Sequence, residues 1–253
     1  MRRVLVLLAV ALCLICITSC DNDNDEGIFS IYDPYFHPTE DFYLMIEFYK
    51  DLSWDSMGVY LNVMSKSELH SLSLGQVTLM PDYVSYNASL KYNSYSFDWG
   101  GTIGDYDQDL DYSLFFMDKT VTGSLRVPSE YFCDLPPFDS EQDLSLSWVL
   151  NHNPQEQHAS VSFRTADNNY IHFSPKLKPA HRSLTLSEAT WNQFEEVTGG
   201  DVSLVSYNYE YKDGGLVLIS STFEDEFGDW KGKQANRPRF ADLLLSGQIQ
   251  PLK

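Results

Sequence analysis

Residues 143–150 read DLSLSWVL, and apolar and polar side chains alternate along this stretch. Leu144, Leu146, Trp148 and Leu150 fall on one side of an extended chain, whereas the two serines between them fall on the other. Because successive side chains of a β-strand point to opposite faces of its sheet, this pattern predicts a strand with one face in a hydrophobic core. We therefore expect Trp148 to be buried.

The same two-residue period recurs on both sides of this stretch, with little helical periodicity. It is found at residues 41–49, 58–65, 75–81, 89–97, 111–118, 122–128, 158–165, 170–174, 183–187, 205–211 and 216–223. Between the last two, Lys212-Asp213-Gly214-Gly215 predicts a hairpin, because Asp-Gly tolerates the positive φ angles of a two-residue turn. Only residues 187–196 and 239–247 could form short helices.

These repeated short strands predict an all-β protein with two antiparallel β-sandwich domains in tandem. One such domain needs ~100 residues, so the length of the chain suits two. We place the boundary at Val127-Pro128, where one strand ends and a proline-containing segment begins. The predicted domains are residues 28–127 and residues 128–253, the second with a short C-terminal extension.

The C-terminal half resembles a fibronectin type III domain or a similar immunoglobulin-like domain. Residues 144–148 resemble its tryptophan-bearing second strand, residues 184–186 before Trp191 resemble its corner, and residues 202–211 with 216–223 resemble its final hairpin. Trp191 stands where a corner leucine is expected, and residues 194–200 lengthen the connection. For residues 28–127 the pattern indicates a β-sandwich without naming its family.

The N-terminal segment has the parts of an export signal. Arg2 and Arg3 precede an apolar run, Val4 to Ile17, that is shorter than the ~20 residues needed to cross a bilayer as a helix. Ile17-Thr18-Ser19-Cys20 resembles the bacterial lipobox, which implies removal of residues 1–19 and acylation of the Cys20 sulfur. The alternative is a plain signal peptide that ends in a chance cysteine.

An acidic tether, residues 20–27, follows the predicted lipid attachment site. It carries four acidic residues and no folding signal before residue 28. Such a run resembles the surface-export signal of Bacteroidetes lipoproteins, whereas Asp21 beside the cysteine also resembles the inner-membrane retention signal of enterobacteria. We expect a lipid anchor in the outer membrane that faces the exterior, with the periplasmic face as the alternative.

The formal net charge of −19 excludes two classes of partner. So acidic a chain is repelled by nucleic acid and by anionic lipid headgroups, which leaves the N-terminal lipid as the expected membrane contact. Of the four cysteines, Cys13 and Cys16 lie in the signal and Cys20 is the lipid site. Cys133 then has no partner for a structural disulfide, and we expect it to be a small buried residue.

The stretch 105–111 places aspartates at alternate positions, as the oxygen ligands of calcium loops are placed. Leu110 stands where the glycine of an EF-hand belongs and Phe116 where its closing glutamate belongs, so the stretch is no EF-hand. An acidic turn and an irregular calcium site remain as alternatives. His152 and His158 lack the spacing of a zinc site, and no catalytic motif is present, so we predict no metal, cofactor or enzymatic activity.

Aromatic residues make up 14% of the chain, and they indicate binding more strongly than any catalytic motif does. Aromatic rings stack on sugars and are common at protein interfaces. Tyr95 and Trp99, in YNSYSFDWGG (residues 92–101), are the candidate ligand-binding residues, with a place in the core as the alternative.

The expected function is that of a non-enzymatic envelope lipoprotein for adhesion, assembly or ligand capture, similar to the immunoglobulin-like lipoproteins of Bacteroidetes. A glycan-binding lipoprotein that assists an outer-membrane importer is the alternative. A glycoside hydrolase is a third hypothesis, which would require two convergent carboxylates in a cleft.

Overall fold

The computed structural model describes residues 40–51, 56–88, 90–97, 99, 103–167, 169–191 and 197–228. Within these ranges the protein is almost entirely β, which confirms the predicted class. The strands are β1 (Phe42–Asp51), β2 (Ser56–Ser65), β3 (Leu69–Leu74), β4 (Val77–Leu79), β5 (Tyr83–Asn87), β6 (Tyr92–Ser96), β7 (Asp109–Phe116), β8 (Thr120–Arg126), β9 (Phe132–Asp134), β10 (Leu144–Val149), β11 (Glu156–Thr165), β12 (Tyr170–Phe173), β13 (Lys176–Leu177), β14 (Ser183–Leu186), β15 (Val197–Lys212) and β16 (Gly215–Gly228).

The helices expected at residues 187–196 and 239–247 have different outcomes. The first contains a single 3-10 turn, η2 (Glu188–Thr190), and its residues 192–196 lie outside the described ranges. The second lies wholly outside them, as do the signal and the tether, residues 1–27. No helix in the described part of the chain is long and apolar enough to cross a membrane.

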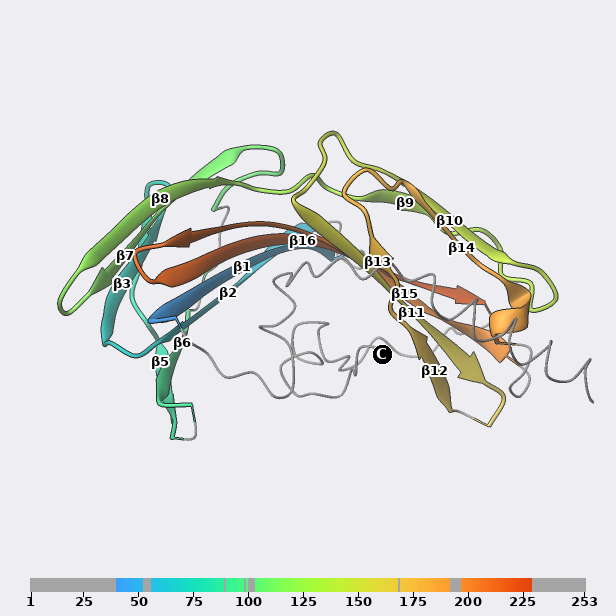
Figure 1. Ribbon diagram of the computed structural model, residues 1–253, viewed down its shortest axis with the longest axis horizontal. Helices are drawn as coiled ribbons and strands as arrows, with labels where there is room; N and C mark the ends of the chain where they lie inside the picture. The colour runs from blue at the N-terminus through green and yellow to red at the C-terminus, as the bar shows by residue number, and fades with distance from the viewer. Residues whose placement is uncertain are drawn as a thin grey trace, which may run out of the picture.

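A nine-stranded sheet runs through the whole molecule (Figure 1). Its order is β12-β11-β15-β16-β1-β2-β6-β5, and β13 also pairs with β11. The pairing of β1 with β16 is parallel, from Phe42 with Gly215 to Tyr49 with Thr222. A parallel pair needs a crossover connection, and here almost the whole intervening chain supplies it. This pair departs from the antiparallel pairing that the sequence predicts.

Two smaller antiparallel sheets pack on the large one and enclose separate hydrophobic cores. The four-stranded sheet β4-β3-β7-β8 covers the first core, where Phe42, Ile46 and Phe116 are fully buried. The three-stranded sheet β14-β10-β9 covers the second core, which contains Trp148 and Trp191. Trp148 is only 3% exposed, so its predicted burial is confirmed.

The long hairpin β15–β16 contributes to both cores. Val217 and Ile219 of β16 belong to the first core, whereas Phe223 and Phe227 belong to the second. Residues two apart in a strand share a face, so both small sheets cover the same face of the large sheet. The predicted hairpin is confirmed, but it is not confined to the C-terminal half.

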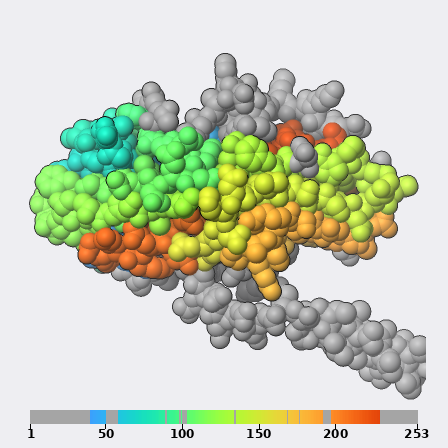
Figure 2. Space-filling model, turned by 90° about the horizontal axis from the view of Figure 1, so that it is seen from above, coloured from blue at the N-terminus to red at the C-terminus, as the bar shows by residue number. Residues whose placement is uncertain are grey.

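The chain passes from one core to the other at the predicted boundary. Val127 belongs to the first core and Tyr131 to the second. The large sheet is not divided there, because β1 of the first half pairs with β16 of the second. The two halves are therefore sandwiches built on one shared sheet, and they form a continuous elongated body (Figure 2).

Candidate functional site at the tip of the long hairpin

The tip of the β15–β16 hairpin is a two-residue turn between the paired residues Lys212 and Gly215. Asp213 and Gly214 both have positive φ, at 49° and 82°. This is the turn that the Asp-Gly sequence predicts, since its handedness matches the twist of the two strands.

The start of β1 is fastened to this tip. The Asp41 backbone N–H donates to the Gly214 carbonyl at 2.7 Å, and the Phe42 ring lies directly against Gly215. A side chain at position 215 would overlap the Phe42 ring, so glycine is what lets β1 approach β16 here.

Two lysines flank Asp41, Lys119 over the rings of the first core and Lys66 over the Tyr92 ring. Lys66 Nζ lies 3.6 Å from Asp41 Oδ1, and Lys119 Nζ lies 3.7 Å from Asp41 Oδ2. Lys119 Nζ also donates to the Asp213 carbonyl at 3.1 Å. These groups are exposed, so the ion pairs contribute little to stability and serve mainly to fix the turn.

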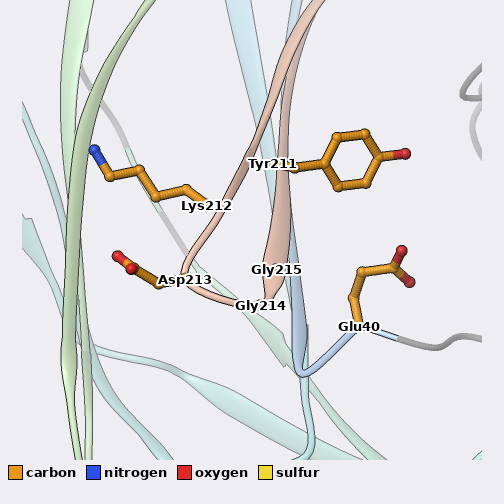
Figure 3. Close-up of a pocket in the computed structure, with 6 residues that line it drawn as sticks. All are labelled: Glu40, Tyr211, Lys212, Asp213, Gly214 and Gly215. Atoms are coloured by element: carbon orange, nitrogen blue, oxygen red, sulfur yellow. The ribbon is translucent and has the colours of Figure 1, made fainter.

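The opposite side of the tip is an open hollow of about 360 Å³, lined by Glu40 and residues 211–215 (Figure 3). The Tyr211 ring and the Glu40 carboxylate lie on this side of the hairpin, whereas Lys212 and Asp213 point to the other. Tyr211 is paired across the ladder with Leu216, and Leu216 with Tyr43, so the three side chains share one face of the large sheet.

A tyrosine cluster supports Glu40. The Tyr43 hydroxyl donates to Glu40 Oε2, and the Tyr92 hydroxyl donates to the Glu40 backbone carbonyl. The Tyr43 and Tyr92 rings are 6.0 Å apart between centroids and are almost fully buried. Tyr211 is different, because 62% of it is exposed.

The environment raises the pKa of all three phenols above the ordinary value of 10.0, so they are protonated at neutral pH, as an unperturbed tyrosine is. Burial, followed by the charges of Glu40 and Asp41, raises the pKa of Tyr92 to about 12. Burial and the hydrogen bond to Glu40 raise the pKa of Tyr43, and partial burial and the charges of Glu40 and Glu156 raise the pKa of Tyr211. The Tyr211 hydroxyl is therefore a hydrogen-bond donor beside the Glu40 carboxylate.

These groups have the chemistry that recognises a sugar. An exposed aromatic face packs against the C–H face of a pyranose ring, and a carboxylate accepts hydrogen bonds from its hydroxyls. The volume lies at the small end of the range of known ligand sites, which extends from roughly 300 to 1,000 Å³.

The structure does not present the predicted residues Tyr95 and Trp99 together as an open surface. Tyr95 is 2% exposed and lies in the first core, where its hydroxyl accepts a hydrogen bond from the Leu69 N–H at 3.0 Å. Its ring faces are covered, so stacking on a sugar is not possible there. Trp99 is partly buried and packs against the same core.

Within the acidic stretch 105–111, Asp107 is the centre of a hydrogen-bond cluster. Asp107 accepts hydrogen bonds from Ser129 Oγ at 2.5 Å, Asn151 Nδ2 at 2.7 Å and His152 Nδ1 at 2.9 Å. Burial opposes ionisation, but these three donors outweigh it and lower the pKa of Asp107. No group of three or more histidine, cysteine, aspartate or glutamate side chains in the described ranges could hold a metal ion.

The same cluster brings together a serine, a histidine and an aspartate without forming a catalytic triad. Ser129 Oγ donates to Asp107, and it accepts from the His152 backbone N–H at 3.0 Å. In a triad the serine hydroxyl donates to the histidine ring, which then removes its proton. Here Ser129, Asp107 and His152 instead hold the connection between the two cores.

The sequence predicts a buried position for Cys133 and lipid attachment at Cys20. Cys133, in β9, forms no disulfide with a described residue and packs against the second core, but it is half-buried and not fully buried as expected. Cys20, the predicted lipid attachment site, lies outside the described residues.

Sequence reasoning missed Glu40 and Tyr211. The signal for Tyr211 was present, because Tyr207, Tyr209 and Tyr211 alternate up to the Asp-Gly turn and must share a face. Tyr207 is 2% exposed and Tyr211 is 62% exposed, so burial decreases toward the tip. Glu40 carried no such signal, because it reaches the tip only through the parallel pairing of β1 with β16.

No protein-family model matches the chain, and no curated protein matches it.

Proposed function

We propose that the protein is a non-enzymatic, lipid-anchored protein of the cell envelope that captures a ligand at its surface, and that this ligand is a glycan. The observation that supports this proposal most directly is the exposed Tyr211 ring beside the Glu40 carboxylate at the tip of the long hairpin. The resemblance of residues 17–20 to a lipobox and the acidic tether support the envelope location.

The geometry of the tip favours capture of an external ligand. The turn is fixed by Asp41 and Lys119, and the Glu40 carboxylate is fixed by Tyr43, so the recognition groups need little ordering when a ligand binds. The strand order of the C-terminal half, with β14-β10-β9 over β11-β15-β16, supports the proposed likeness to an immunoglobulin-like domain.

We propose a non-enzymatic role because the serine, histidine and aspartate that lie together in the described residues hold the connection between the two cores and do not form a catalytic triad. The Ser129 hydroxyl is committed to Asp107 and cannot be deprotonated by His152 in this arrangement.

An array of plant and animal oligosaccharides, followed by calorimetric titration of the best soluble glycan, tests the proposal. Tyr211→Ala should weaken binding by roughly two- to tenfold, because an aromatic stacking contact contributes about 0.5–1.5 kcal/mol. Glu40→Gln should weaken it less. Tyr170→Ala is the matched control, because Tyr170 is also an exposed strand tyrosine, at 47%, but lies at the far end of the sheet.

Two results would contradict glycan capture at the tip. One is the absence of any bound oligosaccharide on the array. The other is an equal loss of binding in Tyr211→Ala and Tyr170→Ala, which would place the binding surface elsewhere.

A further inference from the structure

Strand β5 (Tyr83–Asn87) forms one edge of the nine-stranded sheet. Within the described ranges it pairs with β6 alone, and all five of its residues are exposed. Tyr83 is 63%, Val84 52% and Tyr86 62% exposed. The β5–β6 hairpin projects beyond the strands around it (Figure 1). The outer side of β5 therefore presents backbone N–H and C=O groups in the spacing that a further strand would pair with.

The edge strands β8 and β12 are less available for pairing than β5. Strand β8 is the edge of the four-stranded sheet, but Asn208 Nδ2 donates to the Arg126 carbonyl at 2.8 Å, and the Tyr112–Glu210 hydrogen bond lies over Gly123. Strand β12, at the opposite edge of the large sheet, has only four residues. Natural sheets usually protect such edges with charges, prolines or bulges, and residues 83–87 contain none of these.

A groove lies directly beside the β5 edge, on the face of the sheet that carries the first core. Val84 pairs with Tyr95, and because paired residues share a face, Val84 points to that side. The groove is about 420 Å³ and is lined by Val84, Pro81, Asn93, Tyr95 and Glu68–His70. Val84 is the β5 residue that lines the groove, so a strand added to β5 would place the side chain opposite Val84 next to it.

Charge indicates what kind of strand fits. Strand β5 is uncharged, with Asp82 before it and Glu68 in the groove, and the whole chain carries −19. A second copy of so acidic a chain is repelled, whereas a neutral or basic segment is attracted.

We propose that β5 is a strand-addition site that receives an extended segment of a different polypeptide, with an apolar side chain beside Val84 at the groove and basic residues near Glu68 and Asp82. Backbone pairing provides the affinity and the groove provides the selectivity. The site is separate from the hairpin tip, so it goes beyond the proposed capture of glycans.

A synthetic peptide of alternating valine with lysine or threonine, KVTVKVTVK, labelled with fluorescein, tests the proposal by fluorescence anisotropy on the full chain in detergent. The same peptide N-methylated at every backbone nitrogen keeps its side chains and charge but has no backbone donors. We expect it to bind at least about tenfold more weakly.

Two matched variants locate the site. Val84→Lys places a charge in the groove and should weaken binding about tenfold or more. Val149→Lys is the control, because Val149 is an exposed strand valine in the other half, at 60%, and it should bind as the wild type does. Tyr211→Ala should also bind the peptide normally, which separates this result from the test of glycan capture.

Several outcomes would overturn the proposal. These are no binding of the peptide up to about 1 mM, equal binding of the N-methylated peptide, or equal effects of Val84→Lys and Val149→Lys. Sedimentation that shows a dimer of the wild type, broken by Val84→Lys, would mean that a second copy occupies the edge. Both variants are at exposed positions and should melt as the wild type does.

Discussion

Phe42 and Gly215 are the first pair of the only parallel ladder among the described strands, and the Phe42 ring occupies the space where a side chain at 215 would lie. Phe42 is 0% exposed, and its ring is enclosed by the first core. This contact allows β1 to join the two sandwiches into one sheet.

Gly215→Ala should therefore lower the free energy of unfolding by about 1–3 kcal/mol, the usual effect of overpacking a core. Urea denaturation measures the change. The double variant Phe42→Leu, Gly215→Ala should lower the free energy of unfolding by less than the sum of the two single variants. Leucine is smaller than phenylalanine and leaves part of the space next to position 215 for the alanine side chain. Strict additivity would mean that the two side chains do not compete.

Trp148→Ala should destabilise the protein by about 3–5 kcal/mol, since it empties a buried indole site. Trp148→Phe should lower the free energy of unfolding much less. The Trp148 Nε1 atom is buried without a hydrogen-bond partner in the described structure, so replacing the indole with a phenyl ring breaks no hydrogen bond. Because β15 and β16 serve both cores, calorimetry should show one transition. Two separated transitions in Trp148→Ala would mean that the halves unfold independently.

Asp107 should make the junction between the cores sensitive to acid. Its hydrogen bonds lower its pKa in the folded protein below the ordinary 3.8, so its stabilising contribution is present above about pH 4 and is lost as the pH falls through the lower folded value. Asp107→Asn should be less stable than the wild type at pH 7, by about 1–3 kcal/mol.

The difference between Asp107→Asn and the wild type should become smaller as the pH falls below about 4. Asp109→Asn, at an exposed position, is the control for the loss of one negative charge. A difference that does not change with pH would show that the carboxylate form of Asp107 is not what the junction requires.

Local patterns predicted the local structure well. The alternation in residues 143–150 gave the strand and the buried face of Trp148, and Asp-Gly gave the hairpin turn. Each of these depends on neighbours within a few residues, where the two-residue period and positive φ angles leave few alternatives.

The shared sheet could not be predicted in the same way. The pairing of β1 with β16 joins residues about as far apart in the sequence as the described chain allows, and nothing near Phe42 or Gly215 specifies it. The candidate site depends on this pairing, because it brings Glu40 to Tyr211. For a related reason the sequence left open whether Tyr95 lies in the core or on the surface, since alternation shows that a strand has two faces but not which face is buried.

Cys20→Ala tests the predicted anchor, which lies outside the described residues. If Cys20 carries the acyl chains, the variant has none of them and should lose labelling by a palmitate analogue. It should also leave the membrane fraction, because the acyl chains are the expected membrane anchor. Fractionation of cells that express each form measures both effects. A variant that still carries label and stays with the membrane would contradict the lipobox interpretation.

Trp99 and Tyr211 should respond in opposite ways to alanine substitution. Trp99 packs against the first core, so Trp99→Ala should lower the free energy of unfolding by about 1–3 kcal/mol, while the folded fraction binds glycan normally. Tyr211 is 62% exposed, so Tyr211→Ala should change stability by no more than about 0.5 kcal/mol and should weaken glycan binding. Melting and glycan retention measured on both variants separate the two roles. If Trp99→Ala melts as the wild type does and loses glycan binding, the sugar-binding surface lies at Trp99 and the assignment to the hairpin tip is wrong.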